Sequence, residues 1–250
     1  MRSGVIALLV FVAISRSDFL LPFQLSDDLI NYTAQLEQPI NNETICQFTQ
    51  LNFCQNAFNN YLGINTSLTY RDGSNLFNSI QSLLNMNVTE FNKVCQARTN
   101  FYHCLGQSYY ACMNLHTRLE NDAANAFDYV RSFRGLEWIC GGGFRESVGQ
   151  YDCLEGIPTT NTYQSCINYF HQTVSTGNFC PFIQLTGDCL NDGYKSVCGD
   201  NAVCFSIFLH YSNLISRLVI MDVRASVTSS TGLAQDSSAQ GEINKFRKVL

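Results

Sequence analysis

The twelve cysteines of this 250-residue chain constrain its fold more than any other feature. Their number is even, and all of them follow residue 45. In an oxidising compartment such a set indicates a disulfide framework, here of up to six bonds with open connectivity. Zinc would need shorter Cys-x2-Cys spacings, which are absent from the sequence. The predicted disulfide residues are Cys46, Cys54, Cys95, Cys104, Cys112, Cys140, Cys153, Cys166, Cys180, Cys189, Cys198 and Cys204.

The first residues indicate the compartment. Arg2 precedes an uncharged apolar stretch over residues 5–14, and small residues at 13, 15 and 17 offer signal-peptidase sites. An apolar stretch of about ten residues is too short for a membrane span, which needs about twenty. We therefore predict a signal peptide over residues 1–17 and a secreted, extracellular protein. The alternatives are a buried N-terminal helix and a short anchor.

The charge balance argues against nucleic acid as a partner. The chain has 15 basic and 20 acidic residues. Cleavage after Ser17 would remove Arg2 and Arg16, leaving 13 basic against 20 acidic residues and a net charge of −7. Binding to a phosphate backbone needs a basic patch.

Helix geometry excludes some cysteine pairings. Cys46 and Cys54 are eight residues apart, as are Cys104 and Cys112, in segments that we predict to be helical. Eight helical residues rise about 12 Å, whereas a disulfide needs Cα atoms within about 7 Å. Neither pair should bond to itself. If one helix spans residues 87–116, its cysteines face different sides, which would make it a central element unless the chain breaks near its glycine at 106.

Four acceptor sequons for N-linked glycans lie in the first 90 residues. They begin at Asn31, Asn42, Asn65 and Asn87, and none has proline at its middle position. We predict a glycoprotein with its sugars attached toward the N-terminal end of the chain. Residues 18–45 are interpreted as a glycosylated lead-in to a cysteine-rich helical domain over residues 46–223.

The hydrophobic periodicity favours an all-α, disulfide-crosslinked fold. Apolar residues repeat at i, i+3, i+4 and i+7 over residues 74–86 and again over residues 120–140. Asn87 and Glu90 form a plausible capping pair for the next helix. Further helices are predicted over residues 163–174 and 201–223, and we find no clear alternating strand pattern.

The C-terminal region divides into an apolar helix and a polar tail. Residues 202–221 are rich in Phe, Ile, Leu and Val, but Arg217 would be costly inside lipid. We therefore predict a buried or amphipathic helix and no membrane span in the mature chain. Residues 224–250 are interpreted as a disordered tail rich in Ser and Thr.

The sequence shows little sign of catalysis. None of the histidines lies in a His-Glu-x-x-His motif, and no Gly-x-Ser-x-Gly motif occurs. Residues 188–193 match a calcium loop only in part, and Cys140-Gly-Gly-Gly143 predicts a glycine-rich helix end. We assign no catalytic, metal-binding or cofactor residue, and expect surface or packing roles for the histidines. These are His103, His116, His171 and His210.

Several cysteines and neighbouring apolar residues follow a family-like spacing. They are Phe91-Asn-Lys-Val-Cys95, Cys104-Leu105, Cys112, Gly135-Leu-Glu-Trp-Ile-Cys140, Phe144 and Cys153-Leu154. In this spacing the chain resembles the nematode chondroitin proteoglycan 4 domain over roughly residues 46–222. The related cysteine-rich T20D4.11-like (DUF19) domain has a late Cys-x8-Cys-Gly, matched here by Cys189, Cys198 and Gly199. The resemblance implies a small extracellular helical domain with disulfides and without catalytic residues.

The same resemblance does not imply a proteoglycan. Chondroitin chains start on Ser-Gly, and the single Ser-Gly here, Ser3-Gly4, lies in the predicted leader. We expect a secreted, non-enzymatic module, matrix-associated or host-facing. Its partner would be an extracellular protein, a glycan or a small apolar ligand, and no cofactor is implied. The alternatives are a binder of an apolar molecule between helices and a secreted hydrolase.

Overall fold

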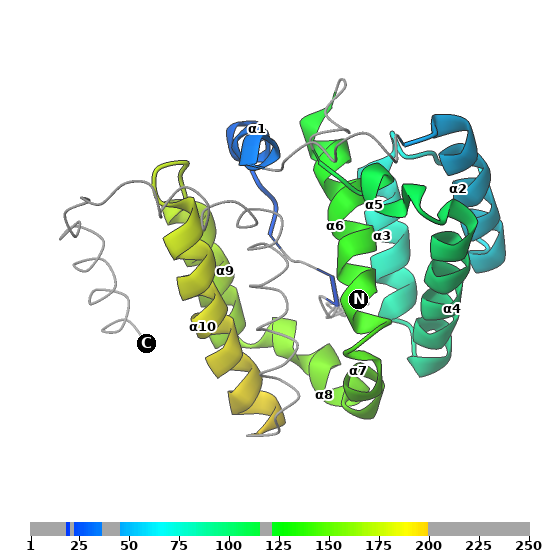
Figure 1. Cartoon of the computed structure of the whole chain (residues 1–250). Coiled ribbons are helices and arrows are strands. Elements are labelled where there is room, and N and C mark those ends of the chain that lie inside the picture. Colours follow the sequence, from blue (N-terminus) through cyan, green and yellow to red (C-terminus); the bar gives the residue numbers. More distant parts are fainter. Residues whose placement is uncertain (1–18, 21–22, 37–45, 116–121, 200–250) are drawn as a thin grey trace, which may run out of the picture.

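The computed structural model of the chain describes residues 19–20, 23–36, 46–115 and 122–199. Every regular element in these ranges is a helix (Figure 1), which confirms the predicted all-α class. The predicted leader, the helix over 201–223 and the polar tail lie outside the described residues.

The first group of helices, which we call the N-terminal bundle, occupies residues 46–140. Its elements are α2 (Phe48–Leu62), α3 (Gly73–Leu84), α4 (Val88–Leu105), α5 (Ser108–Cys112) and α6 (Ala123–Ile139). In Figure 1 these helices lie together on the right. Helix α3 packs along α6, and α4 packs against α2, α3 and α6.

Local sequence signals account for α3 and α4. Leu76, Ile80 and Leu84 of α3 are spaced one turn apart and are fully buried, as the periodicity predicts. The predicted cap of α4 is confirmed, because the Glu90 backbone N–H donates to the Asn87 side chain at 2.9 Å. These signals set where two central helices begin and end.

Aromatic rings fill the centre of the N-terminal bundle. The rings of Phe101 and Phe133 stack with centroids 4.4 Å apart, and Phe58 lies 5.4 Å from Phe133. All three side chains are buried. Rings at such distances add about 0.5–1.5 kcal/mol per pair beyond the burial of apolar area. Helices α2, α4 and α6 therefore meet in one aromatic core.

The second group, which we call the C-terminal bundle, occupies residues 144–198. Its elements are α7 (Phe144–Gly149), α8 (Tyr151–Gly156), the 3-10 turn η1 (Ile157–Thr159), α9 (Asn161–Thr173) and α10 (Phe179–Cys198). Helix α9 matches the helix predicted over 163–174, whereas the sequence pattern did not predict the 20-residue α10. Helices α9 and α10 pack side by side.

Residues 19–20 and 23–36, which we call the N-terminal segment, lie between the two bundles (Figure 1). The segment includes α1 (Asp27–Leu36), a helix that the sequence pattern did not predict. The ring of Phe19 packs on Phe91 and Tyr151, and the ring of Phe23 packs on Phe170 at 4.4 Å. A segment interpreted as a lead-in thus supplies core side chains to both bundles.

A buried arginine fastens this segment to α6. The Arg131 side chain is 2% exposed, and its guanidinium donates to the Phe23 carbonyl at 2.6 Å. The guanidinium also pairs with the Asp128 carboxylate at 2.8 Å and lies 3.7 Å from the Phe77 ring centre. A buried charge needs partners of this kind to offset its lost hydration. The N-terminal segment is therefore bound by a polar contact as well as by its rings.

Candidate functional site

Ten of the predicted disulfide cysteines are joined in pairs. The bonds are Cys46–Cys112, Cys54–Cys104, Cys95–Cys140, Cys153–Cys198 and Cys166–Cys189. Their Cα–Cα distances run from 4.7 to 5.9 Å, within the normal range. The side chains of Cys180 and Cys204 lie outside the described part of the chain, so it stays a prediction that these two cysteines form disulfides.

The two pairs with eight-residue spacing bond crosswise. Cys46 reaches Cys112, and Cys54 reaches Cys104, so neither pair bonds to itself, as predicted. The prediction that a continuous helix separates Cys104 from Cys112 is wrong, because the helix that contains Cys104 is interrupted. It ends at Leu105, and Gly106 takes a positive φ of 53° before α5 begins. Cys46 also precedes the start of α2, so only part of the chain between Cys46 and Cys54 is helical.

Helix α4 is bonded on two sides. Cys95 joins it to Cys140 at the end of α6, and Cys104 joins it to Cys54 on α2. The single helix predicted over residues 87–116 is broken at Gly106, but Cys95 and Cys104 both lie on α4, so the expected bonds to more than one neighbour are present. The expected helix end at Cys140 is confirmed too, because the Gly141 and Gly143 N–H groups both donate to the Trp138 carbonyl.

The sequon asparagines that the structure describes are exposed. Asn31 lies on α1, Asn65 lies in the turn after α2, and Asn87 caps α4. Asn42 lies outside the described residues. Exposure is a requirement for a glycan rather than evidence of one, so glycosylation remains a prediction.

Two of the four histidines lie in the described ranges. His103 is exposed beside the Tyr102 ring, and His171 lies beside the Phe170 ring. Partial burial lowers the pKa of the His171 imidazole. Within the described residues neither imidazole bonds to a carboxylate. His116 and His210 lie outside these ranges.

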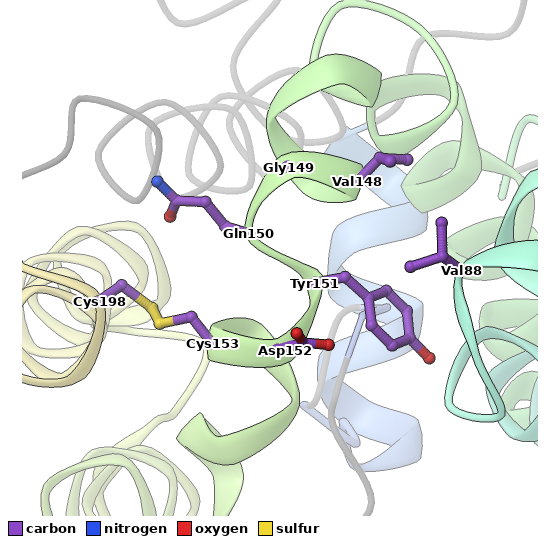
Figure 2. Close-up of a pocket in the computed structure, with 8 residues that line it drawn as sticks. All are labelled: Val88, Val148, Gly149, Gln150, Tyr151, Asp152, Cys153 and Cys198. Atoms are coloured by element: carbon purple, nitrogen blue, oxygen red, sulfur yellow. A yellow bond between two sulfur atoms is a disulfide. The ribbon is translucent and has the colours of Figure 1, made fainter.

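A surface pocket of about 400 Å³ forms where α4, α7, α8 and α10 meet. In Figure 2 the Cys153–Cys198 disulfide and Gln150 lie to the left of the ribbon that carries residues 149–153, and Tyr151 and Val88 lie to its right. The full lining is Val88, Val148, Gly149, Gln150, Tyr151, Asp152, Cys153 and Cys198. Its volume is within the range of about 300–1,000 Å³ that small ligands occupy.

The polar groups of this pocket suit binding better than catalysis. The Tyr151 hydroxyl donates to the Leu84 carbonyl at 2.7 Å, so its proton is already engaged. Burial, and then the charges of Glu155 and Asp152, raise the pKa of Tyr151 to about 12. A hydroxyl that ionises so late is a poor acid or base at neutral pH. The Asp152 carboxylate and the Gln150 side chain also line the wall.

No sequence motif pointed to this pocket. Its walls come from residues 88, 148–153 and 198, which the Cys153–Cys198 bond and the fold bring together. Within the described ranges, no three His, Cys, Asp or Glu side chains come together in a way that would hold a metal ion. Among the same residues, no helix is long and apolar enough to cross a membrane.

Scans against models of protein families, curated proteins and solved structures found no match to this chain. The resemblance to the chondroitin proteoglycan 4 domain therefore stays a prediction.

Proposed function

We propose that this protein is a secreted, non-enzymatic extracellular module that binds a partner through its rigid surface. The disulfide framework carries the proposal: five bonds join ten cysteines across different elements. Disulfides of this density persist in oxidising compartments and are rare in the cytosol. The apolar stretch over residues 5–14 and the four sequons support the same compartment.

The pocket beside Tyr151 is the binding site that we propose within this module. The Asp152 carboxylate offers hydrogen bonds, Val88 and Val148 offer apolar contact, and Gln150 also lines the wall. A mixed lining favours a polar or amphipathic group, such as a sugar or a partner's side chain, over a wholly apolar ligand.

Production of the full chain in secretory eukaryotic cells tests the proposed compartment. We expect the protein in the medium, beginning after Ser15 or Ser17, without thiols that react under denaturing conditions. Retention inside the cell with several reactive thiols would contradict the proposal.

Native mass spectrometry of the secreted protein tests the proposed pocket. A co-purifying ligand should be lost from a Gln150→Ala, Asp152→Ala variant and retained in the control Asp192→Ala, whose side chain is exposed on α10. Equal retention of the ligand by both variants would show that the binding site lies elsewhere.

A further inference from the structure

A second pocket, of about 420 Å³, lies between α1 and the turn from α9 to α10. Figure 1 shows α1 beside this turn, and the Tyr32 and Phe179 rings meet edge-on at 6.1 Å. The lining residues are Asp28, Asn31, Tyr32, Gln35, Thr176 and Gly177. The Asn31 sequon asparagine therefore forms part of the pocket wall.

The four α1 residues of this wall lie on one face of the helix. Asp28, Asn31, Tyr32 and Gln35 have i, i+3, i+4 and i+7 spacing, which places them in one stripe. The opposite stripe is buried in the core and consists of Leu29, Ile30, Thr33 and Ala34. A sugar attached to Asn31 would begin in the outer stripe, next to the pocket.

The chemistry of the wall suits a sugar. Asp28, Gln35 and Thr176 supply a carboxylate, an amide and a hydroxyl, which can bond to sugar hydroxyls. Tyr32 supplies an aromatic ring for the apolar face of a sugar, and Phe179 holds that ring in place. Gly177 leaves open space, because a Cβ added there would meet no atom within 4 Å.

We propose that an N-linked glycan on Asn31 packs its first sugar into this pocket and ties α1 to the C-terminal bundle. The proposal rests on the secretion proposed above, because only a secreted chain receives this glycan. Residues 18–45 contain no cysteine, so no disulfide can hold α1. The glycan would supply the tie that the disulfide framework lacks.

Hydrogen exchange on the secreted protein tests the tie. Three chains are compared: wild type, Asn31→Gln without the sequon, and Gly177→Leu with the sequon kept but the pocket filled. We expect amides of residues 27–36 to exchange about fivefold faster or more in both variants, a coupling of ordinary size. Glycopeptide mapping should show Asn31 occupied in wild type and in Gly177→Leu.

Two controls separate the sugar from the side chain. Asn65→Gln removes an exposed sequon that lies outside this pocket, and it should leave the exchange of residues 27–36 unchanged. Wild type and Asn31→Gln made in the bacterial periplasm carry no glycan but still form disulfides, and these two should exchange equally.

The outcomes distinguish this inference from the proposed function. If Asn31 is occupied and both variants exchange like wild type, the sugar is no tie and the inference is overturned. If the chain is secreted with Asn31 bare, the inference also fails, while the proposed function stands. If residues 27–36 stay protected in Asn31→Gln by a different bound molecule, the pocket serves a free ligand and the inference is wrong. A chain retained in the cytosol with free thiols overturns both.

Discussion

The two bundles build their cores in different ways. In the N-terminal bundle, Phe58, Phe101 and Phe133 come from three of its own helices and pack on one another. In the C-terminal bundle, Phe170 packs on Phe23 of the N-terminal segment. The centre of the N-terminal bundle is thus made of rings from its own helices, and outside this centre Phe91 packs on Phe19 and Tyr151. In the C-terminal bundle, the fully buried ring of Phe170 has a partner in the N-terminal segment.

The disulfides follow the same division. Three bonds close the chain within residues 46–140 and two within residues 153–198, and none of these five joins the bundles. Among the described residues, noncovalent contacts also join the bundles, directly through the Tyr151–Leu84 hydrogen bond. They are joined indirectly through Phe23, which accepts a hydrogen bond from Arg131 and packs on Phe170. Disulfides therefore stabilise each bundle, and noncovalent contacts, both direct and through the N-terminal segment, hold the two together.

Full reduction should have the largest effect. Five bonds at roughly 2–4 kcal/mol each rival a typical total stability of about 5–15 kcal/mol. We expect the reduced, alkylated protein to lose its cooperative melting transition by circular dichroism. Limited proteolysis should cut residues 144–198 first, because the N-terminal bundle has a central cluster of rings from its own helices, whereas Phe170 of the C-terminal bundle packs on a ring of the N-terminal segment. A helical spectrum and melting temperature unchanged by reduction would refute the role assigned to the disulfides.

Loss of the buried carboxylate should have the next largest effect. Asp128→Ala removes the carboxylate that pairs with the buried Arg131 at 2.8 Å, and we expect a loss of about 3–5 kcal/mol in the free energy of unfolding. Urea denaturation measures this loss. Asp192→Ala, an exposed change on α10, should stay within about 0.5 kcal/mol of wild type. Similar values for the two variants would show that Arg131 does not need its partner.

Replacement of glycine by alanine should change the free energy of unfolding in opposite directions at one position in each bundle. A Cβ at Gly73 would overlap the Asn125 carbonyl oxygen, so Gly73→Ala should destabilise the protein by about 1–3 kcal/mol. A Cβ at Gly193 in α10 would meet Thr162 at an ordinary 3.6 Å. Gly193→Ala should therefore stabilise the protein by about 0.5–1 kcal/mol through helix propensity. Thermal melts of both variants measure the two changes. Melting temperatures that shift in the same direction would contradict the difference in space around Gly73 and Gly193.

Loss of the hydrogen bond between Tyr151 and the Leu84 carbonyl should have the smallest effect. Tyr151→Phe leaves the Leu84 carbonyl without its side-chain donor and should cost about 1 kcal/mol at pH 8. Because the folded-state pKa of Tyr151 is about 12, above the unfolded value of about 10, its stabilising effect is complete below pH 10. That effect is then lost as the pH rises toward about 12.

Urea midpoints of both chains at pH 8, 10 and 11.5 measure this dependence. The advantage of wild type over Tyr151→Phe should shrink as the pH rises. Tyr61→Phe is the control, because that side chain is 46% exposed. An advantage that persists at pH 11.5 would mean that Tyr151 ionises no later than an ordinary tyrosine.

The sequence determined those features that depend on neighbouring residues. Leu76, Ile80 and Leu84 repeat with the period of a helix, and Asn87 caps the next helix through an atom three residues away. The eight-residue spacings predicted that Cys46 does not bond to Cys54 or Cys104 to Cys112, which the observed bonds confirm. The helix predicted to separate the second pair is nevertheless broken at Gly106. Which cysteine bonds to which was not predicted, because equal spacing suits parallel and antiparallel segments alike, and the structure shows the antiparallel arrangement.

Only the tertiary structure decided α10, the N-terminal segment and both pockets. Helix α10 contains Pro181 and Gly193, residues of low helix propensity, so its sequence did not predict a helix. Packing on α9 and the bonds of Cys189 and Cys198 override that preference. The partners of Phe23 and Tyr151 lie tens of residues or more away along the chain. Helical periodicity reports only which face of a segment is buried, and it carries no information about which distant segment covers that face.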